Sequence, residues 1–239
     1  MTILLALKVS AGVVLAADSR LSISEGGKPV FVSDTNTKLF GQSGNPLGIM
    51  TCGSAFLQGR AVWSWLDEFI EEKSGEFESP DLAAQGLAQW MPSPDSSSIT
   101  FVLAGFDPKA NHGPDARMLK VTKFSDGTCH HFDLSSSAIF WDGEFDAITR
   151  LLLGFAPVYG ESLVACENFG SGEVRVPYYA FGLQEGIEYV EFLVKTQIQF
   201  QRFIAEPQSC GGPIDIATIT PQSGFRWIKR KEISQSPNG

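Results

Sequence analysis

The second residue of the chain, Thr2, could act as a nucleophile that carries its own base. Removal of Met1 is feasible because the residue after it is small. The new terminal threonine would then hold a free α-amine, with a pKa of about 8, beside its own hydroxyl. Such a unit can attack a carbonyl carbon, but many proteins begin with Met-Thr, so the dipeptide alone does not establish this chemistry.

An expected β-hairpin brings charged side chains to this threonine. Two apolar runs, residues 2–9 and 12–17, are separated by a turn of small residues, which is typical of paired antiparallel strands. In the register set by that turn, Asp18 and Arg20 lie beside Thr2. These two residues could serve the nucleophile, or they could form an ordinary surface ion pair at a strand end.

Lys38 begins another expected strand of the same sheet. A buried lysine near a hydroxyl nucleophile favours the deprotonated hydroxyl and stabilises negative charge that develops on the substrate. Lys38 is therefore a candidate for that role.

The rest of the chain contains runs of expected strands and runs of expected helices, inferred from apolar periodicity and from turn and cap residues. After a loop at 22–29 we expect strands at 30–33, 38–41, 47–52, 99–106, 118–124, 129–132, 214–220 and 225–229, and helices at 54–73, 79–90, 144–154 and 183–204. Runs of each class favour an α+β fold with antiparallel sheets and helices packed outside them. Since no linker stands out, we expect a single domain over 1–239, with a flexible tail at about 232–239.

Five segments occur in an order that carries a family resemblance. They are TILLALKVSAGVVLAADSR, DTNTKLFG, LGIMTCGSA, FVLAGFDPKA and SCGGPIDIATITP. Together they resemble the proteasome β-subunit family and a related bacterial ring protease, which are N-terminal nucleophile (Ntn) hydrolases. The resemblance covers most of the chain, is strongest over residues 1–60, and implies a four-layer αββα sandwich.

The resemblance also implies roles for the candidate residues. Thr2 attacks the scissile carbonyl with its α-amine as general base, once Met1 is removed. Asp18 and Lys38 form a charge pair that sets the protonation of the amine and the hydroxyl, and Arg20 supports them. The backbone N–H of Cys52 contributes to the oxyanion hole.

A pocket for the residue before the cleaved bond is implied as well. The loop after Arg20 and residues 38–50 would shape it. Met50 would then favour medium-sized apolar side chains.

The chain departs from the family pattern in three places. The family usually has glycine where Cys52 stands. Later in the chain, the family has a further catalytic aspartate three residues before the serine of an SGG motif. Here Glu206 stands three residues before Ser209, but an extra residue separates Ser209 from the glycines. Both assignments are left open, and residues 141–143 (Trp-Asp-Gly) occupy the region of the family's central Ser-Gly pair.

Composition restricts the possible partners. With 27 acidic and 18 basic residues the net charge is −9, which disfavours nucleic acid and anionic lipid as partners. The basic run at 229–231 is interpreted as a solvated strand end. No apolar stretch is long enough to span a membrane and the start lacks a basic region typical of signal peptides, so a cytoplasmic location is expected.

No cofactor or metal is expected. The four cysteines are widely and irregularly spaced, which favours free thiols over a zinc site or a disulfide framework. His130 and His131 are adjacent on a strand and would point to opposite faces. Residues 170–172 (Gly-Ser-Gly) lack the lysine and helix start of a phosphate loop, and Cys52 lacks an identifiable histidine partner for thiol catalysis.

Two functions remain. The first is a threonine-type amide hydrolase, most simply a peptidase, which acts on peptides or unfolded proteins. The second is a catalytically inactive structural or scaffold subunit of the same fold. The family resemblance implies a homo-oligomeric ring and a separate ATPase partner.

Overall fold

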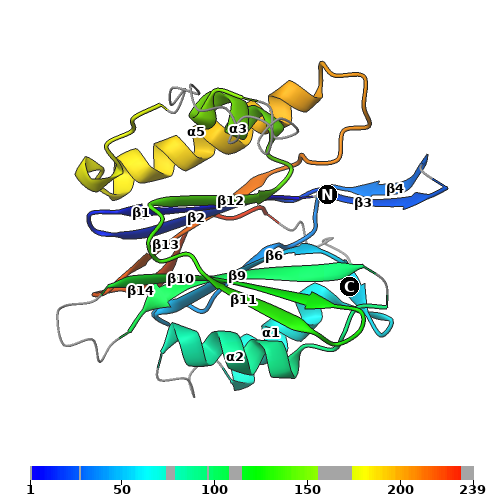
Figure 1. Ribbon diagram of the computed structural model, residues 1–239, viewed down its shortest axis with the longest axis horizontal. Helices are drawn as coiled ribbons and strands as arrows, with labels where there is room; N and C mark the ends of the chain where they lie inside the picture. Colours follow the sequence, from blue (N-terminus) through cyan, green and yellow to red (C-terminus); the bar gives the residue numbers. More distant parts are fainter. Residues whose placement is uncertain are drawn as a thin grey trace, which may run out of the picture.

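The computed structural model describes residues 2–26, 28–73, 79–95, 97–107, 115–155 and 174–232. Two sheets lie face to face, and each carries helices on its outer side (Figure 1). This is the α+β, four-layer αββα sandwich that the resemblance implies.

The first sheet holds the start of the chain. Its strands follow the order β12 (Ile139–Gly143), β1 (Ile3–Val9), β2 (Gly12–Asp18), β13 (Ile214–Thr220) and β14 (Gly224–Lys229). All of its pairings are antiparallel, and Leu4 lies opposite Ala17. The expected register of the first hairpin is therefore confirmed.

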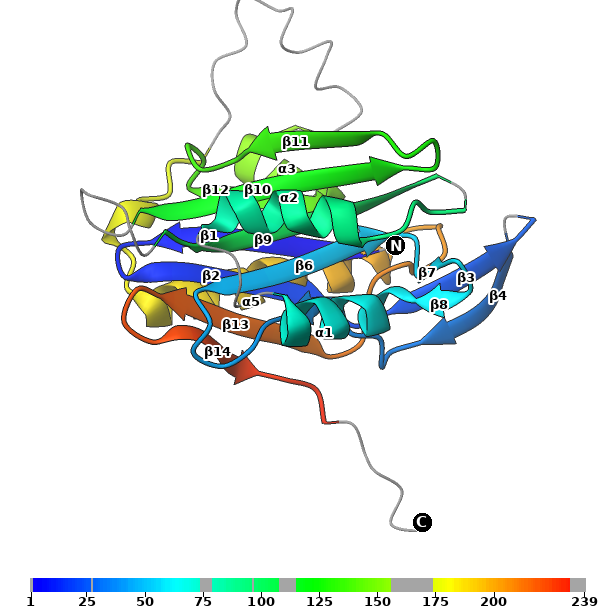
Figure 2. The ribbon, with the colours of Figure 1, turned by 90° about the horizontal axis from the view of Figure 1, so that it is seen from below.

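The second sheet runs in the order β11 (Cys129–Asp133), β10 (Ala116–Phe124), β9 (Ser98–Phe106), β6 (Leu47–Gly53) and β5 (Leu39–Phe40). Helices α1 (Val62–Glu72) and α2 (Pro80–Trp90) cover its outer face, and α3 (Asp146–Leu153) and α5 (Leu183–Gln201) cover the outer face of the first sheet (Figures 1 and 2). A short 3₁₀ turn, η3 (Tyr178–Ala180), precedes α5.

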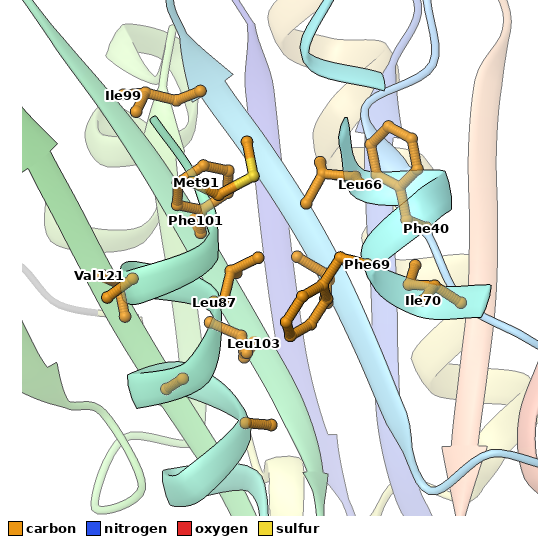
Figure 3. Packing of buried hydrophobic residues seen from close by; sticks show 14 of the residues in the cluster. Phe40, Leu66, Phe69, Ile70, Leu87, Met91, Ile99, Phe101, Leu103 and Val121 are labelled. Carbon is orange, nitrogen blue, oxygen red and sulfur yellow. The ribbon is translucent and has the colours of Figure 1, made fainter. Parts of the chain in front are cut away.

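Hydrophobic packing joins the four layers. One buried cluster lies between the two sheets, and another joins α3 and α5 to the first sheet. The third joins α1 and α2 to the second sheet, where Leu66 and Phe69 of α1 face Leu87 and Met91 at α2 (Figure 3). Burial of these apolar side chains is the main favourable contribution to folding.

Local capping explains where several helices begin and end. Ser79 accepts a hydrogen bond from the Leu82 N–H at the start of α2, and Pro80 occupies the first turn. Helix α5 ends at Gln201, three residues before the expected end. The next two N–H groups, of Arg202 and Phe203, bond three residues back, so the helix tightens and stops.

The helix expected at 54–73 is wrong over its first eight residues, 54–61. Two short strands, β7 (Phe56–Leu57) and β8 (Arg60–Ala61), form a hairpin there, and α1 begins only at Val62. Gln58 and Gly59 connect them with positive φ angles of 51° and 75°. Positive φ at both central residues suits a tight hairpin turn and excludes a right-handed helix.

The loop expected at 22–29 is also wrong. Strands β3 (Leu21–Glu25) and β4 (Lys28–Ser33) pair there as a separate two-stranded sheet, which projects beyond the main sheets (Figure 2). Polar and glycine residues suggested a loop, whereas cross-strand pairing decided the conformation.

One further difference concerns the basic run at 229–231, which was expected to be solvated. Lys231 is not solvated: it is buried in an ion pair with Asp215. The expected tail lies outside the described residues from 233 onward. Among the described helices, none has the length and hydropathy needed to cross a bilayer.

Candidate active site

A pocket of about 480 Å³ opens where the first residues of β1 meet the end of β6. Thr2, Arg20, Lys38 and Cys52 are among its lining residues. Its wall is formed by residues just before β1 and just before β5, by β3, by the end of β6 and by the start of α1. Four of the residues singled out in the sequence therefore meet in one cavity.

Asp18 and Lys38 form an ion pair buried beside this pocket. Lys38 Nζ lies 2.7 Å from Asp18 Oδ1, and the two side chains are 3% and 0% exposed. Asp18 also accepts backbone hydrogen bonds from Ile3 (2.9 Å), Arg20 (3.2 Å) and Gly211 (2.8 Å). These donors compensate the carboxylate for the water that it loses on burial.

Burial and charge act in opposite directions on Lys38. Desolvation lowers the pKa of its ammonium group, whereas Asp18 opposes that change by favouring the charged form. A lysine with a lowered pKa, next to a hydroxyl, is suited to exchange a proton or to stabilise an alkoxide.

Arg20 supports the pocket through a second ion pair. Its guanidinium binds the Asp34 carboxylate through both oxygens, at 2.7 and 2.8 Å. This contact lowers the pKa of Asp34, mainly through the side-chain hydrogen bond. The guanidinium also packs against Gly211, the residue that donates to Asp18. Arg20 therefore supports Asp18 indirectly, through its contact with Gly211.

Strand β12 fixes the backbone of Thr2, and the sequence reasoning missed this strand. Gly143 pairs with Ile3, and the Glu144 N–H donates to the Thr2 carbonyl oxygen at 2.6 Å. The signal was present as an apolar run, Ile139-Phe140-Trp141, that ends in Asp-Gly. Thr2 itself is buried, with 6% of its surface exposed.

Cys52 lies on the pocket wall, but its side chain packs with the cluster between the sheets. Burial raises the pKa of its thiol to about 12, so the thiol stays protonated. Met50 is fully buried in the same cluster. Its expected place on the pocket wall is therefore wrong: Cys52, two residues further along the same face of β6, reaches the pocket, whereas Met50 lies deeper between the sheets.

The two later support candidates do not line the pocket. Glu206 is exposed, in the segment between α5 and β13. Ser209 Oγ lies 3.0 Å from Gln201 Nε2, which donates to it. The structure thus places Ser209 against the end of α5, not beside Thr2.

Gln201 is a contact residue that the sequence reasoning also missed. Its side chain is buried and connects Glu144, Ser209 and Cys210. A signal existed: Gln197 and Gln201 continue the helical spacing of the apolar residues of α5, where polar side chains need buried partners.

The described residues hold no group of three or more histidine, cysteine, aspartate or glutamate side chains arranged to bind a metal. His130 and His131 lie on β11, where both are exposed. Residues 170–172 lie outside the described part of the chain.

The sandwich and the pocket define the class of fold: an α+β architecture that matches proteasome β-subunit-like structures. Anbu (ancestral β-subunit) from Yersinia bercovieri is similar over 93% of this chain and 82% of its own, with a TM-score of 0.54 and 14% identity. The Gly-1 mutant of Anbu from Hyphomicrobium sp. strain MC1 is similar over 98% and 87%, with a TM-score of 0.55 and 17% identity. No protein-family model and no curated protein matches the chain. At these identities the likeness establishes the fold.

Proposed function

We propose that this chain is a threonine-type Ntn hydrolase that cleaves amide bonds, with Thr2 as its nucleophile after removal of Met1. The observation that carries the proposal is the buried Asp18–Lys38 ion pair beside the pocket that Thr2 lines. A buried pair is expensive to desolvate and adds little to stability compared with apolar packing. Its place beside a pocket that both Thr2 and Lys38 line supports a chemical role.

The proposed reaction has two steps. The Thr2 hydroxyl oxygen attacks the carbonyl carbon of the substrate, and its proton passes to the α-amine of Thr2. The C–N bond then breaks, the leaving amine takes that proton, and an ester joins Thr2 to the acyl group. Water next hydrolyses the ester, which releases a carboxylic acid and restores the hydroxyl.

The groups around Thr2 support these steps. The Lys38 ammonium group, held by Asp18, would stabilise the hydroxyl oxygen as it loses its proton. The family resemblance assigns the backbone N–H of Cys52 as the donor to the developing oxyanion. Because Cys52 pairs with Thr100 of β9, this N–H would have to leave the sheet ladder to donate to the substrate. Arg20 would hold the segment around Asp18 in place.

Polar groups of the pocket support a peptide as substrate. Within the described residues, the hydroxyls of Ser22 and Thr51 are buried and have no hydrogen-bond partner. Both residues line the pocket. A substrate with backbone amides could pair with either hydroxyl once its side chain rotates toward the pocket, whereas an apolar substrate could not.

The remaining parts of the proposal rest on the family resemblance. The chain 1–239 would act as one domain, assemble into a homo-oligomeric ring in the cytoplasm, and receive unfolded substrate from a separate ATPase.

A catalytically inactive structural subunit is the second candidate. It is favoured by Glu206, which is exposed, and by Ser209, which bonds to Gln201. Neither residue lines the pocket, where the active family members would place their further catalytic residues. In this reading the Asp18–Lys38 pair has only a structural role.

Intact-protein mass spectrometry separates the two candidates. The purified protein is weighed before and after incubation with an epoxyketone or a β-lactone that traps N-terminal threonine. The hydrolase predicts a mass without Met1 and one adduct per chain, which maps to Thr2. A retained Met1 without an adduct would overturn the hydrolase and favour the structural subunit.

A further inference from the structure

A single buried side chain connects the two backbone segments that hold Thr2 and Asp18. Gln201, in the last turn of α5, accepts hydrogen bonds at Oε1 from the Ser209 and Cys210 N–H groups, both at 3.1 Å. The Cys210 thiol donates to the same oxygen at 2.9 Å. On its other side, Gln201 Nε2 donates to Glu144 Oε2 at 3.0 Å.

Glu144 and the residue that follows Cys210 are hydrogen-bonded to residues of the candidate site. The Glu144 N–H donates to the Thr2 carbonyl oxygen at 2.6 Å. Gly211, which follows Cys210, donates its N–H to Asp18 Oδ2 at 2.8 Å, and its carbonyl oxygen accepts from the Ser19 N–H. Gln201 therefore joins the segment at Glu144, which holds the Thr2 carbonyl, to the segment at Gly211, which holds Asp18, in addition to the direct bond from the Ile3 N–H to Asp18.

We infer that Gln201 is a positioning residue: it aligns Thr2 with the Asp18–Lys38 pair by joining the segment at Glu144 to the segment at Gly211. The expected effect of Gln201 on catalysis rests on the proposed function, whereas its role in joining the two segments does not. Amide groups suit this role because one side chain both donates and accepts.

The neighbouring glutamine offers a matched comparison. Gln197 lies one turn earlier on α5 and is equally buried, and its Oε1 accepts from the Ala147 and Ile148 N–H groups at 2.8 and 3.4 Å. It thus caps the start of α3, and within the described part of the chain it makes no hydrogen bond to the segment at Gly211. Loss of Gln197 should loosen α3 without separating the two halves of the site.

The test compares Gln201→Met with Gln197→Met, since methionine keeps the length of the side chain without its hydrogen bonds. Amide hydrogen exchange measured by NMR reports the contacts directly. Gln201→Met should speed exchange of the Gly211 and Glu144 N–H groups by about tenfold or more, relative to Leu15 in the core. The Ser209 and Cys210 N–H groups beside Gly211, and the side-chain carboxylate of Glu144, would lose their partner on residue 201. Gln197→Met should speed exchange only at Ala147 and Ile148.

Covalent labelling of Thr2 by a β-lactone supplies the catalytic readout. In Gln201→Met the maximal labelling rate should fall by about tenfold, while the half-saturating lactone concentration changes by less than about threefold. In Gln197→Met both should stay within about twofold of the wild-type values. Equal losses in the two variants would mean that general helix packing, not positioning, is responsible.

Gln201→Glu keeps the argument testable should Gln201→Met fail to fold. At a pH where both carboxyl groups are ionised, the new carboxylate still accepts from the Ser209 and Cys210 N–H groups but repels Glu144 instead of donating to it, so exchange should rise at Glu144 and not at Gly211. Unchanged exchange at both positions in either Gln201 variant would overturn the inference. A wild-type protein that is not labelled at all would refute the proposed function, while the exchange data would still decide the role of Gln201.

Discussion

Gly143 lies directly against the carbonyl oxygen of Thr2, at the end of β12 beside β1. Its φ is +88°, and a Cβ atom at this position would overlap that oxygen. The start of the chain can therefore keep its place only if residue 143 has no side chain.

Gly143→Ala should consequently displace Thr2. We expect a loss of about 3 kcal/mol in the free energy of unfolding, from the strained φ together with overpacking, and loss of Thr2 labelling. Gly127→Ala is the matched control, since its φ is +87° and its Cβ would meet only Ser93 Oγ at 3.6 Å. That variant should lose only about 1–2 kcal/mol and keep its labelling; similar losses in both would contradict a special contact at Gly143. Urea unfolding and mass spectrometry measure the two effects.

Thr2→Ala should fold normally and lose all labelling and hydrolysis, because it removes the proposed nucleophile but keeps the backbone bond to Glu144. Thr2→Ser retains a hydroxyl and should retain part of the reaction. The measurement is adduct formation with the trapping electrophile, together with the thermal unfolding midpoint. Undiminished turnover by Thr2→Ala would exclude this nucleophile.

Lys38→Met should abolish activity and lower the free energy of unfolding. It leaves the Asp18 carboxylate buried with its three backbone donors, and breaking a buried pair typically costs about 3–5 kcal/mol. Lys229→Met, which breaks an exposed pair with Glu191, should cost less than about 1 kcal/mol. Urea unfolding of both variants gives the comparison, and equal effects would argue against a structural cost of the buried pair.

The buried thiols should be inert in the folded protein. Burial raises the pKa of both Cys52 and Cys210 to about 12, so at pH 8 only about one thiol in ten thousand is ionised. Alkylation followed by peptide mapping should modify these two cysteines only after unfolding in urea. The native, alkylated protein should still be labelled at Thr2, whereas rapid modification of Cys52 with loss of labelling would reopen a thiol mechanism.

Acid should weaken the Arg20–Asp34 contact. The pKa of Asp34 is lowered in the folded state by its hydrogen bonds to Arg20, so its contribution is present above the unfolded value of about 3.9 and is lost as pH falls through the lower folded value. Since Asp34 is 40% exposed, solvent screening limits the contribution to about 1 kcal/mol or less. The stability difference between wild type and Asp34→Asn should therefore shrink between pH 7 and pH 3 in urea unfolding. A difference that stays constant would contradict this assignment.

Much of the sandwich could be predicted from the sequence because its signals are local. Apolar alternation and a turn of small residues specify the first hairpin, and helical spacing specifies α2 and α5. The errors also have local causes. The apolar spacing after Ser54 continues through a hairpin turn at Gln58 and Gly59, and the polar residues between Leu21 and Pro29 resemble a loop although they pair as strands.

The sequence by itself determined that Thr2, Asp18 and Arg20 share one end of a hairpin, because pairing numbers follow from the turn. Only the tertiary structure decided which distant groups complete that end: Gly143 and Glu144 on Thr2, Gly211 on Asp18, and Gln201 between them. Asp18 and Gly211 are 193 positions apart and meet through a backbone N–H, which every residue except proline possesses. Such a contact leaves no mark in residue type or spacing, so it arises only when packing of the sheets and α5 brings the segments together.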